Sequence, residues 1–202
     1  MAIVLAMVQF SSLILSPVLP IFIQTLHSGV LKELGLGVSA MTGLIFGLTG
    51  FTSAISAVIC GRLSDKIGHR RILIISTLGA ALLCIPQMLV DDTFQLLILR
   101  GLTGLFIGGI IPSANAIVSQ LTPRERRGAA YGVIQSVTSL GMAAGPITGA
   151  IVAATADARL VFAVTAVSLL FVSFWVGKVV RPNAITLTVP PTQAQPVAKT
   201  AL

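Results

Sequence analysis

Apolar residues run along most of the chain in long stretches, and charged residues fall between these stretches. Six stretches of eighteen residues or more contain no Asp, Glu, Lys or Arg. A helix needs ~20 residues to cross ~30 Å of hydrocarbon, so each stretch is long enough for about one membrane span. The apolar runs are continuous and do not alternate every second residue, so helices are expected rather than barrel strands. The six stretches are residues 1–31, 34–61, 72–90, 101–123, 128–156 and 160–177.

This pattern predicts an all-α polytopic membrane protein with six transmembrane helices. Composition agrees, because 55% of the 202 residues are hydrophobic and 9% are charged, whereas soluble domains carry roughly 25% charged residues. The first stretch lacks the basic start of a cleaved signal, so we expect it to remain as the first span. Beyond residue 182 the chain is polar, contains prolines and has no periodicity. We therefore expect a six-helix unit over residues 1–182 and a disordered cytoplasmic tail over residues 183–202.

Basic residues are distributed unevenly between the two sides that six spans define. An even number of spans places both termini on one side, together with the loops after the second and fourth spans. Of the thirteen Lys and Arg residues, ten fall on that side and three on the other. This positive-inside bias predicts a multi-pass protein of the cell membrane with both termini in the cytoplasm. The ten are Arg62, Lys66, Arg70, Arg71, Arg124, Arg126, Arg127, Lys178, Arg181 and Lys199, and the three are Lys32, Arg100 and Arg159.

The segment GRLSDKIGHRR, residues 61–71, joins the second and third spans and concentrates charge on the basic side. We expect Gly61 to allow close approach of two helices and Gly68 to adopt a positive φ at a helix end. Asp65 is expected to accept charge-assisted hydrogen bonds from Arg62, Arg70 or a neighbouring helix N-terminus. The alternative is an ordinary solvated basic loop. The candidate residues of this turn are Gly61, Arg62, Asp65, Lys66, Gly68, Arg70 and Arg71.

Glycines recur at every fourth residue in the fifth span. Gly141, Gly145 and Gly149 fall on one narrow helix face, which predicts close packing against another backbone. Pro146 has no amide proton, so we expect it to bend the helix there. A bend beside a flat face would provide a conformational pivot.

An internal repeat relates the second and fifth spans. At an offset of 89 residues the two regions share five identities. Because three spans reverse the direction of each successive copy, we expect two three-helix units in inverted orientation. The identical pairs are Gly43 with Gly132, Ile45 with Ile134, Thr49 with Thr138, Ala54 with Ala143, and Arg70 with Arg159.

Two of these motifs resemble signatures of the major facilitator superfamily. GRLSDKIGHRR is similar to the cytoplasmic turn between the second and third helices of a six-helix half, which helps to latch one conformation in that family. By this resemblance Asp65 and Arg70 or Arg71 are latch residues, and His69 stands where the family more often has Arg. The fifth span is similar to the antiporter motif of the family, with Ala150 in place of its last glycine. The residues of that motif are Gly132, Gly141, Gly145, Pro146 and Gly149.

The resemblance covers residues 1–182, which correspond to one of the two six-helix halves of that twelve-helix fold. SPVLPIFIQTL, GGIIPSANAIVSQLTPRERRGAAYG and RLVF resemble the C-terminal half of a drug:proton antiporter. The implied function is secondary active efflux of hydrophobic drugs or small molecules coupled to protons, with a second six-helix half as partner. The chain is either a fragment or truncated gene, or a half-size protein that dimerises. A non-transporting membrane scaffold or partner subunit is the alternative function.

Polar residues within the spans are mostly uncharged. No Asp or Glu lies in a span core, so coupling carboxylates are expected from the second half. Gln9, Asn115 and Gln135 are substrate-facing candidates, because in the family their spans line the cavity. Hydrogen bonding between helices is the alternative role for these three. We expect Arg100 to snorkel to the membrane interface, with a functional role as the alternative.

Other kinds of chemistry lack the residues that they require. Cys60 and Cys84 have no metal-ligand spacing, so no metal or other cofactor is predicted. The net charge of +7 comes from helix ends and is not interleaved with aromatic residues, which argues against nucleic-acid binding. His27 and His69 fall on opposite sides of the membrane without a nucleophile nearby, so we do not expect an enzyme.

Overall fold

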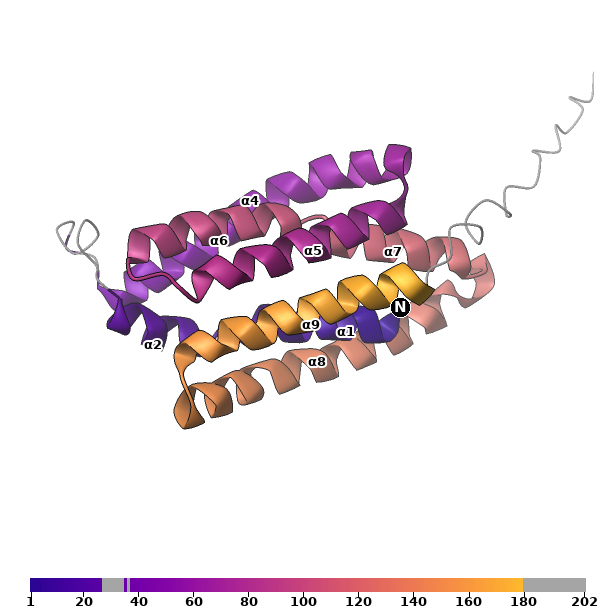
Figure 1. Cartoon of the computed structure of the whole chain (residues 1–202). Coiled ribbons are helices and arrows are strands. Elements are labelled where there is room, and N and C mark those ends of the chain that lie inside the picture. The colour runs from indigo at the N-terminus through magenta and orange to yellow at the C-terminus, as the bar shows by residue number, and fades with distance from the viewer. Residues whose placement is uncertain (27–34, 36, 180–202) are drawn as a thin grey trace, which may run out of the picture.

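The computed structural model describes residues 1–26, 35 and 37–179, and these residues form a helical bundle (Figure 1). Six of its segments are long and apolar enough to cross a membrane, as the sequence predicted. The predicted domain boundary at residue 182 and the tail of residues 183–202 lie outside the described residues. The helices are α1 (Ala2–Leu13), α2 (Val18–Thr25), α4 (Val38–Ile67), α5 (His69–Gln87), α6 (Thr93–Ile107), α7 (Ile110–Leu121), the short 3-10 helix η1 (Arg124–Arg126), α8 (Arg127–Thr155) and α9 (Ala158–Val179).

The first and fourth spans are each divided into two helices. Pro17 precedes α2 and has no amide proton to continue the hydrogen bonding of α1. Gly108 and Gly109 separate α6 from α7, and Pro112 removes a further amide proton in the first turn of α7. Ile14, at the first break, is fully buried in the main apolar cluster of the bundle. Both breaks therefore lie within packed regions and leave each span continuous across the bundle.

Three helix pairs make the most extensive contacts: α1 with α8, α4 with α6, and α5 with α9. The α1 and α8 pair joins spans one and five, and the α4 and α6 pair joins spans two and four. If each span of the first three is matched to its counterpart in the last three, the first of these pairs corresponds to the second. The same matching maps the α5 and α9 pair onto itself. This is the pairing that two inverted three-helix repeats produce. Figure 1 shows α4, α5 and α6 grouped together, and α1, α8 and α9 grouped beside them.

Both described ends of the chain lie at the same end of the bundle. Met1 and the end of α9 share this end with the α4–α5 turn and the α7–α8 connection (Figure 1). Eight of the ten cations assigned to one side lie in or next to these segments, so we call this the basic end. Arg181 and Lys199 are outside the described residues. The eight are Arg62, Lys66, Arg70, Arg71, Arg124, Arg126, Arg127 and Lys178.

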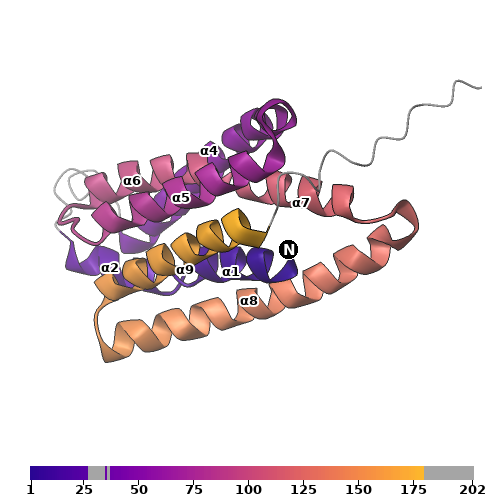
Figure 2. The ribbon, with the colours of Figure 1, turned by 45° about the vertical axis from the view of Figure 1, so that its right-hand side comes forward.

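The second and fifth spans, which are equivalent in the repeat, are the least buried. Only 11% of the most apolar window in the second span and 17% of that in the fifth is buried, against 39% to 44% in the others. Figure 2 shows α8 running along one edge of the bundle. Exposed apolar side chains on these helices include Phe51 of α4 and Leu140 of α8. Lipid or another helical unit must therefore cover these two helices.

Candidate functional site

The α4–α5 turn at the basic end is built around Gly68. Its φ of +102° lies in a region that L side chains rarely adopt, which confirms the expected positive φ. The Gly68 amide donates a hydrogen bond of 2.9 Å to the Ser64 carbonyl, and its carbonyl accepts bonds from the amides of Arg71 and Ile72. The glycine thus ends one helix and begins the next within a single residue.

Asp65 in this turn pairs with a histidine and not with an arginine. His69 Nε2 lies 3.9 Å from Asp65 Oδ1, and its Nδ1 lies 2.9 Å from the Ser64 hydroxyl. Arg70 instead donates a hydrogen bond to the carbonyl of Gly177 in α9. The expected bond from Arg70 to Asp65 is therefore absent from the described residues, because Arg70 points toward the end of a different helix. His69 is a turn residue whose pairing with Asp65 we did not predict, although its i+4 spacing from Asp65 indicated it.

The remaining candidates of the turn are open to the surroundings. A Cβ placed on Gly61 would meet nothing within 4 Å, so the expected close helix approach at Gly61 does not occur among the described residues. Arg62, Lys66 and Arg71 are exposed. The described part of the chain therefore leaves these three cations and the surface of α4 at Gly61 uncovered.

Three glycines of α8 pack against the backbone of α1, as their spacing predicted. A Cβ on Gly145 would lie 3.0 Å from a carbonyl oxygen of α1, and a Cβ on Gly141 or Gly149 would lie closer still to a carbonyl oxygen of α1 or of the residue that directly follows it. Contacts this short with backbone cannot be relieved by moving a side chain. The small residues are therefore what allows α1 and α8 to pack so closely. The carbonyl oxygens facing Gly141, Gly145 and Gly149 belong to Ala6, Phe10 and Ile14 respectively.

The other two residues of the antiporter-type motif differ from these glycines. Gly132 has no neighbour within 4 Å of an added Cβ and lines a cavity. Pro146 lies inside α8, which continues from Arg127 to Thr155. The bend and pivot at Pro146 remain a prediction.

A glycine face on the fourth span was missed by the sequence analysis. A Cβ on Gly104 or Gly108 would meet the carbonyl oxygens of Thr49 and Ser53 in α4. In the contact between the second and fourth spans, as in that between α1 and α8, glycines of one helix pack directly against the backbone of the other. The spacing Gly101-x2-Gly104-x3-Gly108 was the signal that indicated it.

The three substrate-facing candidates line one cavity of about 480 Å³, which we call the amide cavity. Gln9 comes from α1, Asn115 from α7 and Gln135 from α8. The Tyr131 hydroxyl donates a hydrogen bond of 3.2 Å to the Asn115 carbonyl. Apolar side chains complete the wall, so the cavity combines a few polar groups with a mainly apolar surface, as ligand sites do. These apolar residues include Leu5, Ile111 and Ile134.

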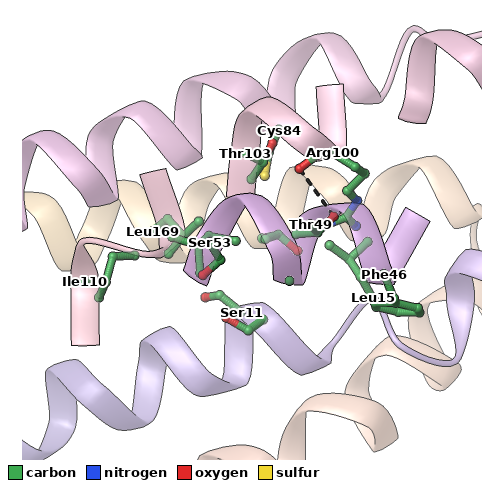
Figure 3. A pocket seen from close by; sticks show the side chains of 14 residues that line it. Ser11, Leu15, Phe46, Thr49, Ser53, Cys84, Arg100, Thr103, Ile110 and Leu169 are labelled. Carbon is green, nitrogen blue, oxygen red and sulfur yellow. Dashed lines mark hydrogen bonds between the residues drawn. The ribbon is translucent and has the colours of Figure 1, made fainter. Parts of the chain in front are cut away.

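A second pocket, of about 250 Å³, has Arg100 in its wall, and we call it the Arg100 pocket (Figure 3). Arg100 is 6% exposed, and its Cζ lies 5.5 Å from the centre of the Phe162 ring. In Figure 3 the side chain extends from α6 toward Thr49 and Phe46 of α4. The expectation that Arg100 snorkels to the interface is wrong, because the side chain packs between helices. Hydroxyl groups in the pocket wall come from Ser11, Ser12, Thr49, Ser53, Thr103 and Thr165.

Six segments long and apolar enough to span a membrane, arranged as two inverted three-helix repeats with cavities between the helices, define the chain as a half of a polytopic membrane transporter fold. The chain belongs to the Major Facilitator Superfamily, whose family model matches residues 1–201. This agrees with the family that the two sequence motifs indicated. It also agrees with the expectation of a transporter.

Similar proteins include several bacterial multidrug resistance proteins. Multidrug resistance protein MdtG of Enterobacter lignolyticus (strain SCF1) is 36% identical over 183 residues, which are 91% of this chain and 40% of that protein. The proteins of the same name from Salmonella typhi and Rahnella sp. (strain Y9602) are 37% and 35% identical over 158 and 161 residues. These matches cover 78% and 80% of this chain and 38% of each relative. The chain therefore spans about two fifths of the length of the curated relatives that it matches.

Proposed function

We propose that this chain is the C-terminal half of a secondary active transporter that exports hydrophobic drugs or other small molecules in exchange for protons. The gathering of Gln9, Asn115 and Gln135 around the amide cavity is the observation that carries this proposal. Amide groups donate and accept hydrogen bonds without carrying charge, so they suit polar atoms of many different substrates. Similarity to proteins named for multidrug resistance supports a drug-like substrate class. Both features favour transport over a scaffold or partner subunit.

A second six-helix half is the partner that this function requires. Alternating access needs one bundle to rock against another around a shared site. A Cβ on Gly43, Gly47 or Gly50 of α4 would meet nothing within 4 Å. Small residues commonly lie at contacts between membrane helices, so these glycines are free to contact a helix of the partner. The partner is an N-terminal half, which would supply the carboxylates for proton coupling, or a second copy of this chain, whose span cores contain none.

The basic end of the bundle faces the cytoplasm of a cell whose membrane this protein spans. The ten-to-three distribution of cations supports this orientation. Ala156 is exposed in the connection between α8 and α9, at the end opposite the basic end. To test the orientation, Arg62→Cys and Ala156→Cys are made separately in a chain carrying Cys60→Ser and Cys84→Ser. A membrane-impermeant maleimide should label the Ala156→Cys chain in intact cells and the Arg62→Cys chain only after lysis. Labelling of the Arg62→Cys chain in intact cells would reverse the orientation.

Transport is tested in liposomes that contain this chain and the part of the Enterobacter relative that it does not match. An imposed pH gradient should drive accumulation of a hydrophobic fluorescent compound. Gln135→Leu should raise the KM roughly 5-fold, because one hydrogen bond of about 1 kcal/mol is lost. Gln24→Leu is the matched control, because Gln24 is exposed on α2 and lies outside the amide cavity.

Two results would contradict the proposal at different levels. Accumulation that does not respond to the pH gradient would rule out proton-coupled export. Equal KM values for the Gln135→Leu and Gln24→Leu proteins would contradict a role of the amide cavity in substrate binding. They would not contradict the proposal that the protein is a transporter.

A further inference from the structure

The guanidinium of Arg100 has hydrogen-bonding capacity that no described residue uses. Its Nε and Nη2 atoms are buried and have no hydrogen-bond partner within the described ranges. The side chain is more than nine-tenths buried, and its nearest electrostatic partner is the face of the Phe162 ring. A ring face contributes little compared with a hydrogen-bonded counter-charge, so a buried cation in this position calls for an acceptor.

Carboxylates of the described residues do not supply that acceptor. The ion pairs found there join Asp65 to His69 and Asp91 to Arg159. Asp92, at the start of the same helix, precedes Arg100 by eight residues, which corresponds to ~12 Å along the helix axis. The positive charge of Arg100 is therefore uncompensated by any acidic side chain that the structure describes.

Three threonine hydroxyls of the pocket already donate hydrogen bonds to the backbone of their own helices. Thr49 and Thr103 donate to carbonyl oxygens one turn earlier at 2.7 Å, and Thr165 donates similarly at 2.8 Å. Ser11 and Ser12 also donate to carbonyl oxygens of α1. Donors directed at a ligand therefore come from Arg100 and Ser53, of which the charged Arg100 is the stronger. A pocket whose strongest free donor is a guanidinium favours an anion and repels a cation.

We propose that the Arg100 pocket binds a monovalent anionic group, either the carboxylate of an amphiphilic molecule or a free halide. The inference rests on the proposed transport function, and it narrows the substrate class from hydrophobic drugs in general toward amphiphilic anions. Ser11 and Ser12 of α1 and Ser53 of α4 border the pocket. An apolar tail would extend past Phe46, Leu15 and Leu169, which also line it (Figure 3).

The test measures binding to the purified chain in nanodiscs, without a pH gradient. Pyrenebutyrate, its uncharged methyl ester and a pyrenylbutyl trimethylammonium cation share one apolar body and differ in charge. We expect pyrenebutyrate to bind roughly 10-fold more tightly than the ester, because a charge-assisted hydrogen bond is made, and the cation to bind most weakly. Arg100→Gln should abolish the preference for the carboxylate, and Arg100→Lys should restore part of it.

Lys178→Gln is the matched control for charge. Lys178 also carries its cation over an aromatic ring, 5.4 Å from the centre of Phe174, but it is exposed at the basic end. Its substitution removes the same charge without altering the Arg100 pocket, so the preference should persist. Equal binding of the carboxylate and the ester to the unmodified chain would overturn the proposal, as would a preference retained by Arg100→Gln. The first comparison needs no variant and therefore does not depend on whether the variant folds.

Chloride titration at constant ionic strength, with isethionate as the replacement anion, distinguishes the two sources of the anion. Displacement of pyrenebutyrate by chloride supports a free halide, and retention of pyrenebutyrate supports an organic carboxylate. Binding does not depend on pumping. A chain that binds anions without export would contradict the proposed function alone, and export without anion preference would contradict this inference alone.

Discussion

The guanidinium of Arg70, in the first turn of α5, donates a hydrogen bond to the carbonyl oxygen of Gly177 near the end of α9. At the other end of the bundle, Arg159 in the first turn of α9 donates a bond of 3.2 Å to the carbonyl of Met88, directly after α5. The offset of 89 residues maps Arg70 onto Arg159 and Met88 onto Gly177. These contacts are therefore one interaction repeated by the inverted repeat. Each places a cation at a helix C-terminus, where carbonyl oxygens lack intrahelical partners.

Arg70→Ala should destabilise the bundle by ~1.5–3 kcal/mol, because a partly buried charge-assisted hydrogen bond is removed. Arg71→Ala is the control, since Arg71 is exposed and its loss should change the free energy of unfolding by less than ~0.5 kcal/mol. Arg159→Ala should cost less than Arg70→Ala, because the Arg159 side chain is 40% exposed. Denaturant unfolding in micelles, followed by circular dichroism, provides the measurement. Equal midpoints for Arg70→Ala and Arg71→Ala would contradict a role for this contact in stability.

Gly149→Ala should destabilise the packing of α1 against α8 by ~1–3 kcal/mol, because the added Cβ would meet the Ile14 carbonyl. Gly132→Ala on the same helix is the matched control, since its Cβ would meet nothing within 4 Å. The control should be neutral or should stabilise the helix by about 0.5–1 kcal/mol. Thermal unfolding of the two variants in the same detergent distinguishes them. A lower midpoint for Gly132→Ala than for Gly149→Ala would refute the packing argument.

Asp65→Asn should slow export by the assembled transporter roughly 5-fold or more while leaving the amount of inserted protein unchanged. The Asp65 side chain is 74% exposed and its pairing with His69 is long, so this residue contributes little to the stability of the half itself. Its contribution is expected in a contact that forms in only one conformation of the transporter. Glu125→Gln is the control, because Glu125 is an exposed acid at the same end. Unaltered efflux by Asp65→Asn, at normal expression, would argue against a latch.

The sequence predicted the fold well because membrane spans depend on a simple property. Apolar length fixes the number of spans, and an even number of spans places both termini at the same end, so neither depends on the details of packing. The glycine face of α8 was predictable for a related reason, since a spacing of four residues fixes a helix face.

Side-chain partners were harder to predict because they depend on how each helix is rotated and on which helix lies next to it. Arg100 shows this, since the sequence places it near a span end and suggests exposure. The rotation of α6 instead directs Arg100 into the bundle, over Phe162 of α9. Arg70 similarly contacts a residue 107 positions away, Gly177, and not Asp65 in its own turn. The residues of the amide cavity could be predicted from the sequence only because the family resemblance indicated which spans line a cavity.

Expressed alone, the chain should insert into a membrane but should not pump. Its second and fifth spans are the least buried, so a single bundle leaves the face that carries them without an opposing protein surface. The span cores contain no carboxylate to bind and release the coupled proton. The purified chain is reconstituted in liposomes, and uptake of a hydrophobic fluorescent compound is followed with and without a pH gradient. The control contains the complementary part of the Enterobacter relative and should respond to the gradient. Gradient-dependent accumulation by this chain alone would contradict the half-transporter proposal and would require a homodimer that couples protons without intramembrane carboxylates.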